Sequence, residues 1–181
     1  NKEVYVRIPN LEIRKCFKND IQKRFSSVFI KHNLHNKLVD ALSCGNQKET
    51  YDIFFDMIQK YVSIRDTATK APLENYYHGF INGIFTSCEK LISEYHSNYE
   101  TGNGYPDILF KDIDCRKVAI IEIKSASIGS DIETLSEKAI SQIIDKNYAE
   151  PFMSNKTVKH IHGYGIAFAG KSCFISVKKI K

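Results

Sequence analysis

Residues 118–124 read Val-Ala-Ile-Ile-Glu-Ile-Lys, and this apolar, β-branched run predicts a strand at the centre of a sheet. Side chains alternate along a strand, so Glu122 and Lys124 are expected on one face and Ile121 and Ile123 on the other. A carboxylate and an ammonium group on a buried strand are costly unless they have partners. The stretch therefore predicts a central strand whose last residues contribute to a polar site.

A second carboxylate is expected beside this site. Residues 105–110 begin the neighbouring strand and place Asp107 at its start. Two carboxylates suit Mg²⁺ (or Mn²⁺), which prefers oxygen ligands, and Asp107, Glu122 and the Ile123 backbone carbonyl would hold the ion. The metal would polarise a scissile phosphate, while Lys124 would orient or deprotonate the attacking water, or neutralise charge in the transition state. A simple ion pair between Glu122 and Lys124 is the alternative interpretation.

The segments around this strand predict an α/β fold, a sheet with helices packed on it. Helical periodicity marks residues 73–93 and 131–152, and short strands are expected at 94–100, 107–110, 118–124, 160–169 and 173–179. Upstream, helices are expected at about 11–30 and 47–63, followed by a polar break at 65–72. The sequence thus predicts a helical N-terminal region over residues 1–70 and a sheet-containing core over residues 71–181.

Residues 165–172, Gly-Ile-Ala-Phe-Ala-Gly-Lys-Ser, match the phosphate-loop pattern of nucleotide hydrolases. That loop works only when a helix follows it, because the helix N-terminus helps to bind the phosphates. The residues after Ser172 are rich in β-formers instead, so a hairpin is favoured and the nucleotide hydrolase is rejected. Lys171 in this hairpin is then at most a contact to a DNA backbone.

Composition restricts the classes of protein further. The net charge of +5 suits a polyanionic partner and equally suits ordinary surface lysine. Five widely spaced cysteines argue against a disulfide framework or zinc site and favour a reducing, cytoplasmic setting. No apolar run approaches the roughly 20 residues of a membrane span, so no membrane partner is expected. The oligomeric state stays open.

Several segments together resemble the PD-(D/E)XK nuclease superfamily, within it a bacterial family often joined to an N-terminal ATPase-like domain. They occur in family order, as YYHGFINGIF (76–85), SNYETGNGYPDILF (97–110), AIIEIK (119–124), AISQIIDKNYA (139–149) and GYGIAFAGK (163–171). Residues 6–17, VRIPNLEIRKCF, resemble the junction that follows the ATPase-like domain. The resemblance implies a restriction-endonuclease-like core, with helix, three-strand meander, helix and closing strands, and an ATPase-like domain in the full-length protein.

The resemblance also implies roles for individual residues. Asp107, Glu122 and Lys124 fall on the nuclease signature, which implies a Mg²⁺-dependent nuclease acting on DNA, or alternatively on RNA. The other implied or candidate residues are Gln142 and Tyr148 as backbone contacts, Glu100 as a further metal ligand, and Glu74, where some superfamily members keep an acid.

Some of these roles have alternatives. A core-edge aromatic is the favoured interpretation of Tyr148 and a solvated helix residue that of Glu74, and Gln142 has the alternative of a helix-surface amide. His78 is interpreted as a hydrogen-bonded helix residue rather than a base. Tyr105 and Pro106 stand where many relatives have a basic residue. The second functional hypothesis is a catalytically silent nuclease-fold module that binds nucleic acid or a protein partner, since fold does not fix function.

Overall fold

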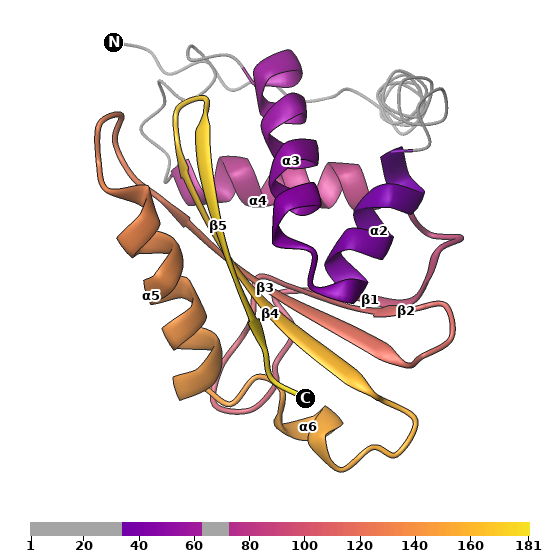
Figure 1. The fold of residues 1–181 in the computed structure, drawn as a ribbon. Helices are drawn as coiled ribbons and strands as arrows, with labels where there is room; N and C mark the ends of the chain where they lie inside the picture. Colours follow the sequence, from indigo (N-terminus) through magenta and orange to yellow (C-terminus); the bar gives the residue numbers. More distant parts are fainter. Residues whose placement is uncertain (1–33, 63–72) are drawn as a thin grey trace, which may run out of the picture.

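The computed structural model describes residues 34–62 and 73–181, which form a five-stranded sheet with helices on both faces (Figure 1). The helices are α2 (Leu34–Cys44), α3 (Gln47–Tyr61), α4 (Leu73–Phe85), α5 (Ile132–Asp145) and α6 (Glu150–Met153). The strands are β1 (Ile92–Ser97), β2 (Ile108–Asp112), β3 (Lys117–Ser125), β4 (His160–Ala169) and β5 (Ser172–Lys179). The predicted α/β class is confirmed and all five predicted strands are present, but the first spans 92–97 rather than the predicted 94–100.

The sheet order follows the sequence order, β1 to β5. Strands β1, β2 and β3 form an antiparallel meander, and α5 then carries the chain across the sheet so that β4 pairs parallel to β3. Strand β5 returns antiparallel to β4. This order of helix, meander, helix and closing strands is the restriction-endonuclease-like arrangement that the sequence predicted.

Strand β3 is buried on both faces, which explains its continuous apolar run. Ile121 and Ile123 pack into the core formed with α2, α3 and α4, whereas Val118 and Ile120 pack into a second cluster with α5 and α6. Figure 1 shows α2, α3 and α4 gathered on one side of the sheet and α5 and α6 on the other. The alternation predicted along residues 118–124 therefore holds.

The N-terminal helical region is partly described. Helix α3 confirms the helix predicted at about 47–63, and α2 and α3 share the larger core cluster with the sheet. Three predicted features lie outside the described residues: the helix at 11–30, the junction-like residues 6–17 and the polar break at 65–72. The division into regions 1–70 and 71–181 stays a prediction.

Two predicted helices were too long. Helix α4 ends at Phe85 rather than at Ser93, because the chain turns at Cys88 and Ile92 already pairs with β2. The predicted helix over 131–152 is divided into α5 and α6. Asn147 adopts a positive φ of 53° after α5, a backbone conformation that an α-helix cannot continue through.

The nucleotide-loop match at residues 165–172 is a hairpin. Strand β4 runs to Ala169, Gly170 turns with φ 59°, and Ser172 pairs with Ala169 at the start of β5. Lys171 donates a hydrogen bond from Nζ to the carbonyl of Gln59 on α3, at 3.0 Å. A strand rather than a helix follows the match, so the hairpin prediction is confirmed.

Helix α5 lies against β4 at Gly165. A Cβ added to Gly165 would overlap the backbone carbonyl oxygen of Ser136 and lie 3.0 Å from Ala139 Cβ. The absence of a side chain at this residue lets the helix approach the strand. Because α5 also carries Gln142, this contact sets how close that side chain comes to β3.

We expect Gly165→Ala to lower the free energy of unfolding by about 1–3 kcal/mol, because an inserted methyl group must push α5 away from the sheet. Urea denaturation would measure it. Gly83→Ala in α4 is the matched control, since an added Cβ there meets nothing within 4 Å. Equal stability of the Gly165 variant and the control would show that the helix does not depend on this close approach.

Candidate active site

Two carboxylates meet where β2 begins and β3 ends. Ile108 pairs with Ile121, so Asp107, just before β2, lies opposite the end of β3. The Asp107 Oδ2 atom accepts a 2.7 Å hydrogen bond from the Ile123 backbone amide. The carboxylate that leads into β2 is thereby fixed to the residue between Glu122 and Lys124.

Glu122 is the buried acid of this site, with 3% of its surface exposed. Its Oε1 accepts hydrogen bonds from Lys124 Nζ at 2.8 Å and from Gln142 Nε2 at 2.5 Å. Its Oε2 is also buried, and no described residue donates a hydrogen bond to it. Oε1 therefore accepts two hydrogen bonds, whereas Oε2 accepts none from the described residues.

The protonation of Glu122 reflects this environment. Burial raises the pKa of the Glu122 carboxyl to about 7, the neighbouring Asp107 carboxylate adds to the rise, and the Lys124 ammonium opposes it. Burial likewise raises the pKa of Asp107, against the hydrogen bond from the Ile123 amide. Both carboxyl groups therefore resist ionising together, and a cation bound between them would favour their ionised forms.

Lys124 lies between two acids, Glu122 on β3 and Glu74 on α4. Its Nζ contacts Glu122 Oε1 and lies 3.9 Å from Glu74 Oε1 on α4. Burial lowers the pKa of Lys124, but the hydrogen bond and charge of Glu122 outweigh it and leave the pKa above its usual value. Lys124 is therefore a fixed positive charge at neutral pH rather than a proton acceptor.

Helix α4 supports the site through His78, one turn after Glu74. His78 Nε2 donates to the Asp107 carbonyl oxygen at 3.1 Å and lies 3.1 Å from Ser97 Oγ on β1. The hydrogen-bonded role expected for His78 agrees with this, but its partner was not foreseen. The spacing of Glu74 and His78, which puts both on one helix face, was the available signal.

Helix α5 supports the site through Gln142. Besides Glu122, Gln142 Nε2 contacts the Tyr148 hydroxyl at 3.3 Å, and Tyr148 is 2% exposed. Gln142 thus holds the Glu122 side chain, and the Tyr148 hydroxyl accepts a hydrogen bond from Gln142. Their predicted contact with a DNA backbone is untested by these interactions, and the burial of Tyr148 favours the core-edge alternative.

The remaining predicted residues lie further out. Glu100 is exposed in the loop that joins β1 to β2, and Lys171 lies at the tip of the β4–β5 hairpin against α3. At Ile123 it is the amide that contacts Asp107, and the predicted role of the carbonyl stays a prediction.

A divalent cation fits the chemistry of these donors. Within residues 34–62 and 73–181, no group of three or more Asp, Glu, His or Cys side chains converges as a metal site. Asp107 and Glu122 nevertheless present oxygen ligands, and the Glu122 Oε2 atom lacks a partner among the described residues. Mg²⁺ often takes only one or two carboxylates and completes its shell with water and phosphate oxygens.

The described cysteines, Cys44, Cys88, Cys115 and Cys173, are all free. Among the helices of the described ranges, none has the length and apolarity needed to cross a membrane.

Comparison with known proteins agrees with this geometry. The sequence model of the PD-(D/E)XK nuclease superfamily matches residues 73–178, from the start of α4 to the last residue but one of β5. The match therefore includes every element that contributes to the site. Among curated proteins, none matches the chain.

The Glu122 pKa predicts a pH-dependent stability. A carboxyl that titrates near 4.5 when unfolded and at about 7 when folded stabilises the fold below pH 4.5 and loses that contribution as the pH rises through 7. We expect the free energy of unfolding of the native chain to fall by up to about 3 kcal/mol from pH 4.5 to 8, relative to Glu122→Gln.

Urea denaturation of both proteins without divalent cations, at several pH values, measures this difference. Asp56→Asn, at an exposed acid on α3, is the control and should follow the native chain. A constant difference between native and Glu122→Gln across the range would mean that Glu122 ionises as an ordinary surface acid.

Proposed function

The chain belongs to the PD-(D/E)XK nuclease superfamily, and on that basis we propose that it is a metal-dependent nuclease hydrolysing phosphodiester bonds of DNA. We assign the catalytic site to Asp107, Glu122 and Lys124. The observation that carries the proposal is the buried Glu122 carboxylate, whose Oε2 has no hydrogen-bond donor among the described residues although Oε1 has two. A buried acceptor without a partner is costly, and a bound cation would remove that cost.

Asp107 and Glu122, with the Ile123 carbonyl, would hold Mg²⁺ or Mn²⁺. When bound, the ion supplies polarisation of the scissile phosphate and a more acidic bound water. The protein's own groups then orient the reactants. The hydrogen bond from Ile123 to Asp107 fixes one carboxylate, and the hydrogen bond from Gln142 fixes the other.

Lys124 has a defined part in this reaction. Because its pKa is raised by the neighbouring carboxylates, it stays protonated at neutral pH. Of the roles that the sequence left open, neutralising the negative charge that builds on the phosphate in the transition state is favoured over deprotonating the water. Its contacts to Glu122 and Glu74 hold the ammonium group beside the acids.

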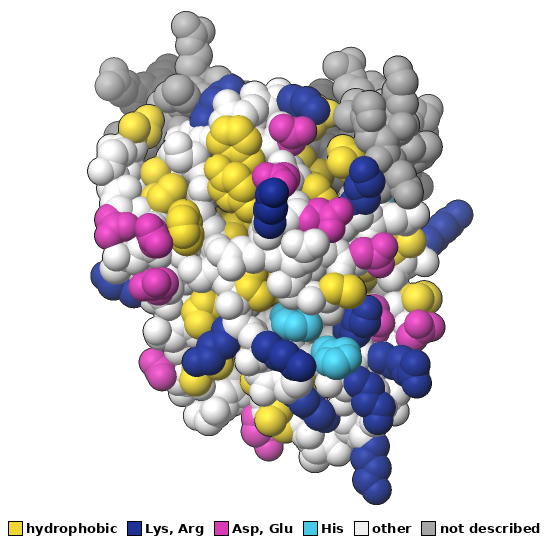
Figure 2. Space-filling model, viewed as in Figure 1, with side chains coloured by type: hydrophobic (Ala, Val, Ile, Leu, Met, Phe, Trp, Pro, Cys, Tyr) yellow, Lys and Arg dark blue, Asp and Glu magenta, His cyan; other side chains and the backbone are white. Residues whose placement is uncertain are grey.

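A polyanionic substrate is supported by a basic surface at the other end of β3. Lys117 on β3 pairs with His160 on β4, and Lys179 on β5 pairs with His162, so these basic residues lie close together. Figure 2 shows lysine and arginine side chains around two histidine rings on the lower part of one face. Such a surface attracts nucleic acid at low salt.

In the full-length protein we further expect an ATPase-like domain before this chain.

The activity test uses supercoiled and linear DNA with Mg²⁺ or Mn²⁺. We expect the native chain to cut, Asp107→Ala to lose more than 99% of the rate, and Lys124→Ala to be slowed by about 10²- to 10³-fold, as when one transition-state donor is removed. The rate of appearance of cleaved product on gels is the measurement.

Asp56→Ala and Lys60→Ala, an exposed ion pair on α3, are the controls and should cut at the native rate. Equal cutting by all variants would contradict the assigned site. Tight DNA binding by a native chain that never cuts would favour the silent nucleic-acid-binding module instead.

Metal binding has its own test, independent of activity. Isothermal titration calorimetry with Mn²⁺ at pH 8 should detect binding to the native chain, weakened at least about tenfold by Asp107→Asn. Because ligand carboxylates must lose their protons and the Glu122 pKa is about 7, affinity should rise from pH 6 to pH 8. Asp56→Asn is the matched control. Affinity that ignores both pH and Asp107→Asn would place the ion elsewhere.

A further inference from the structure

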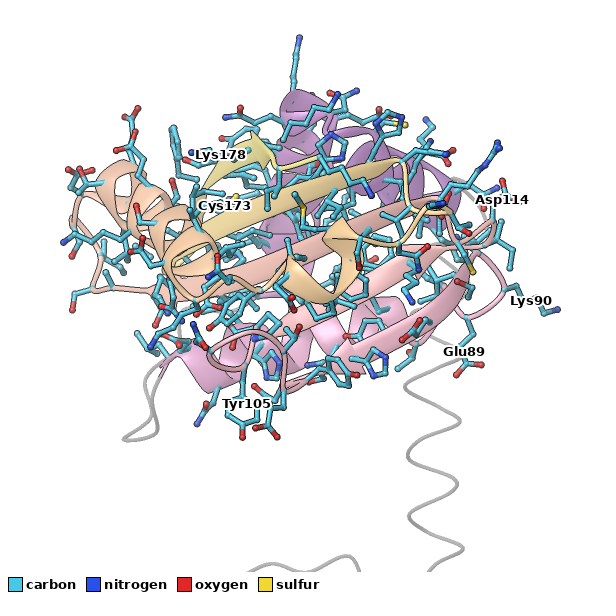
Figure 3. All side chains as sticks on the ribbon, turned by 90° about the horizontal axis from the view of Figure 1, so that it is seen from below. Glu89, Lys90, Tyr105, Asp114, Cys173 and Lys178 are labelled. Carbon is cyan, nitrogen blue, oxygen red and sulfur yellow. The ribbon has the colours of Figure 1, made fainter. Side chains whose placement is uncertain are left out.

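The loop between β1 and β2 carries two exposed aromatic rings. Tyr99 is 40% exposed and Tyr105 is 56% exposed, whereas Tyr77, Tyr148 and Tyr164 are almost fully buried. Figure 3 shows the ring of Tyr105 projecting outward from this loop, away from the sheet. Neither exposed ring contributes to either hydrophobic core cluster. The exposed surface of both rings is therefore available to a ligand.

Both rings are close to the catalytic carboxylate along the chain. The Asn98 amide donates a 3.0 Å hydrogen bond to the Asp107 carbonyl, and Tyr99 follows Asn98 directly. Tyr105 precedes Asp107 by two residues, a span of at most about 7 Å. Consecutive phosphates of a stacked strand rise by about 3.4 Å. The rings thus lie within a few nucleotides of any phosphate bound at Asp107.

The loop is held firmly in position. Asn103 donates its amide to the Lys146 carbonyl at 2.8 Å, Thr101 forms a bridge with Gly104, and Thr101 Oγ1 donates to the Tyr148 carbonyl at 3.3 Å. Gly102, at φ 56°, packs so closely on the Asn147 carbonyl that a Cβ would overlap it.

One of the two rings is also held from the side. The Tyr99 ring stacks on the His96 ring, with centroids 4.1 Å apart. Exposed aromatic rings on a fixed support lose little freedom when a flat ligand stacks on them.

We propose that Tyr105 and Tyr99 stack on unpaired bases next to the scissile phosphate, so that the preferred substrate is single-stranded at the cut. This inference rests on the proposed nuclease function and names its substrate class. In a duplex both faces of each base are covered by neighbouring bases, whereas an unpaired base offers its face to an aromatic side chain. Every base has such a face, so the contact selects strandedness rather than sequence.

Binding is tested first, on the metal-free native chain in EDTA. Fluorescence anisotropy compares a labelled 20-nucleotide single strand with the same sequence as a blunt duplex. We expect Tyr105→Ala to weaken single-strand binding by about 5- to 100-fold and duplex binding by no more than about twofold. Tyr105→Phe should bind like the native chain, and Tyr99→Ala should act in the same direction as Tyr105→Ala. Phe55→Ala, at an exposed ring on α3, is the control and should change nothing.

A strand in which every base is removed separates stacking from loop structure. Native binding to this abasic strand should be weaker than to the intact strand, and Tyr105→Ala should have no further effect on it. A loop distorted by the substitution would instead weaken binding to the intact and abasic strands alike, which would overturn the inference.

Cleavage separates this inference from the proposed function. Single strands and single-stranded ends should be cut faster than blunt duplex, and Tyr105→Ala should remove the preference mainly through KM. Equal cutting of both substrates with no effect of Tyr105→Ala overturns the inference and leaves the nuclease function standing. Base-dependent binding without any cutting supports the inference and overturns the nuclease function.

Discussion

The structure depends on keeping one carboxylate, that of Glu122, inside the protein near the end of a strand that is buried on both faces. Strand β3 is covered on both faces, so its polar end residues have little access to water. The chain meets this constraint with donors from two elements, Lys124 on β3 and Gln142 on α5. The other Glu122 oxygen has no hydrogen-bond partner among the described residues, and that property links the fold to cation chemistry.

The surrounding elements hold this arrangement by close packing. Helix α5 approaches β4 at Gly165, which brings Gln142 to the Glu122 carboxylate. From the other face of the sheet, α4 reaches the Asp107 carbonyl through His78. Residues of both layers therefore converge on the two carboxylates. A site assembled in this way keeps its geometry before substrate arrives, which is what electrostatic catalysis requires.

Much of the fold was predictable because β3 and its neighbours have strong local signals. The β-branched run at 118–124 and the alternation of Glu122 and Lys124 with isoleucines predicted both the strand and the face that carries the acid. Helix ends were less predictable. The helical periodicity of the sequence continues after Phe85, yet Ile92 pairs with β2. Sheet pairing outweighs the weak helix propensity of these residues. The contact between His78 and the Asp107 carbonyl joins residues far apart in sequence, and no local pattern encodes it.

By itself the sequence determined the element types, the family resemblance, and which residues are acidic, basic or apolar at the end of β3. It also excluded the nucleotide loop, because β-formers follow Ser172 where a helix would be needed. Only the tertiary structure decided which Glu122 oxygen is saturated and which is not, that Tyr148 is buried, and that Tyr99 and Tyr105 stay exposed beside Asp107. The physical reason is that burial and hydrogen-bond satisfaction arise from contacts between distant segments, whereas periodicity and composition are local.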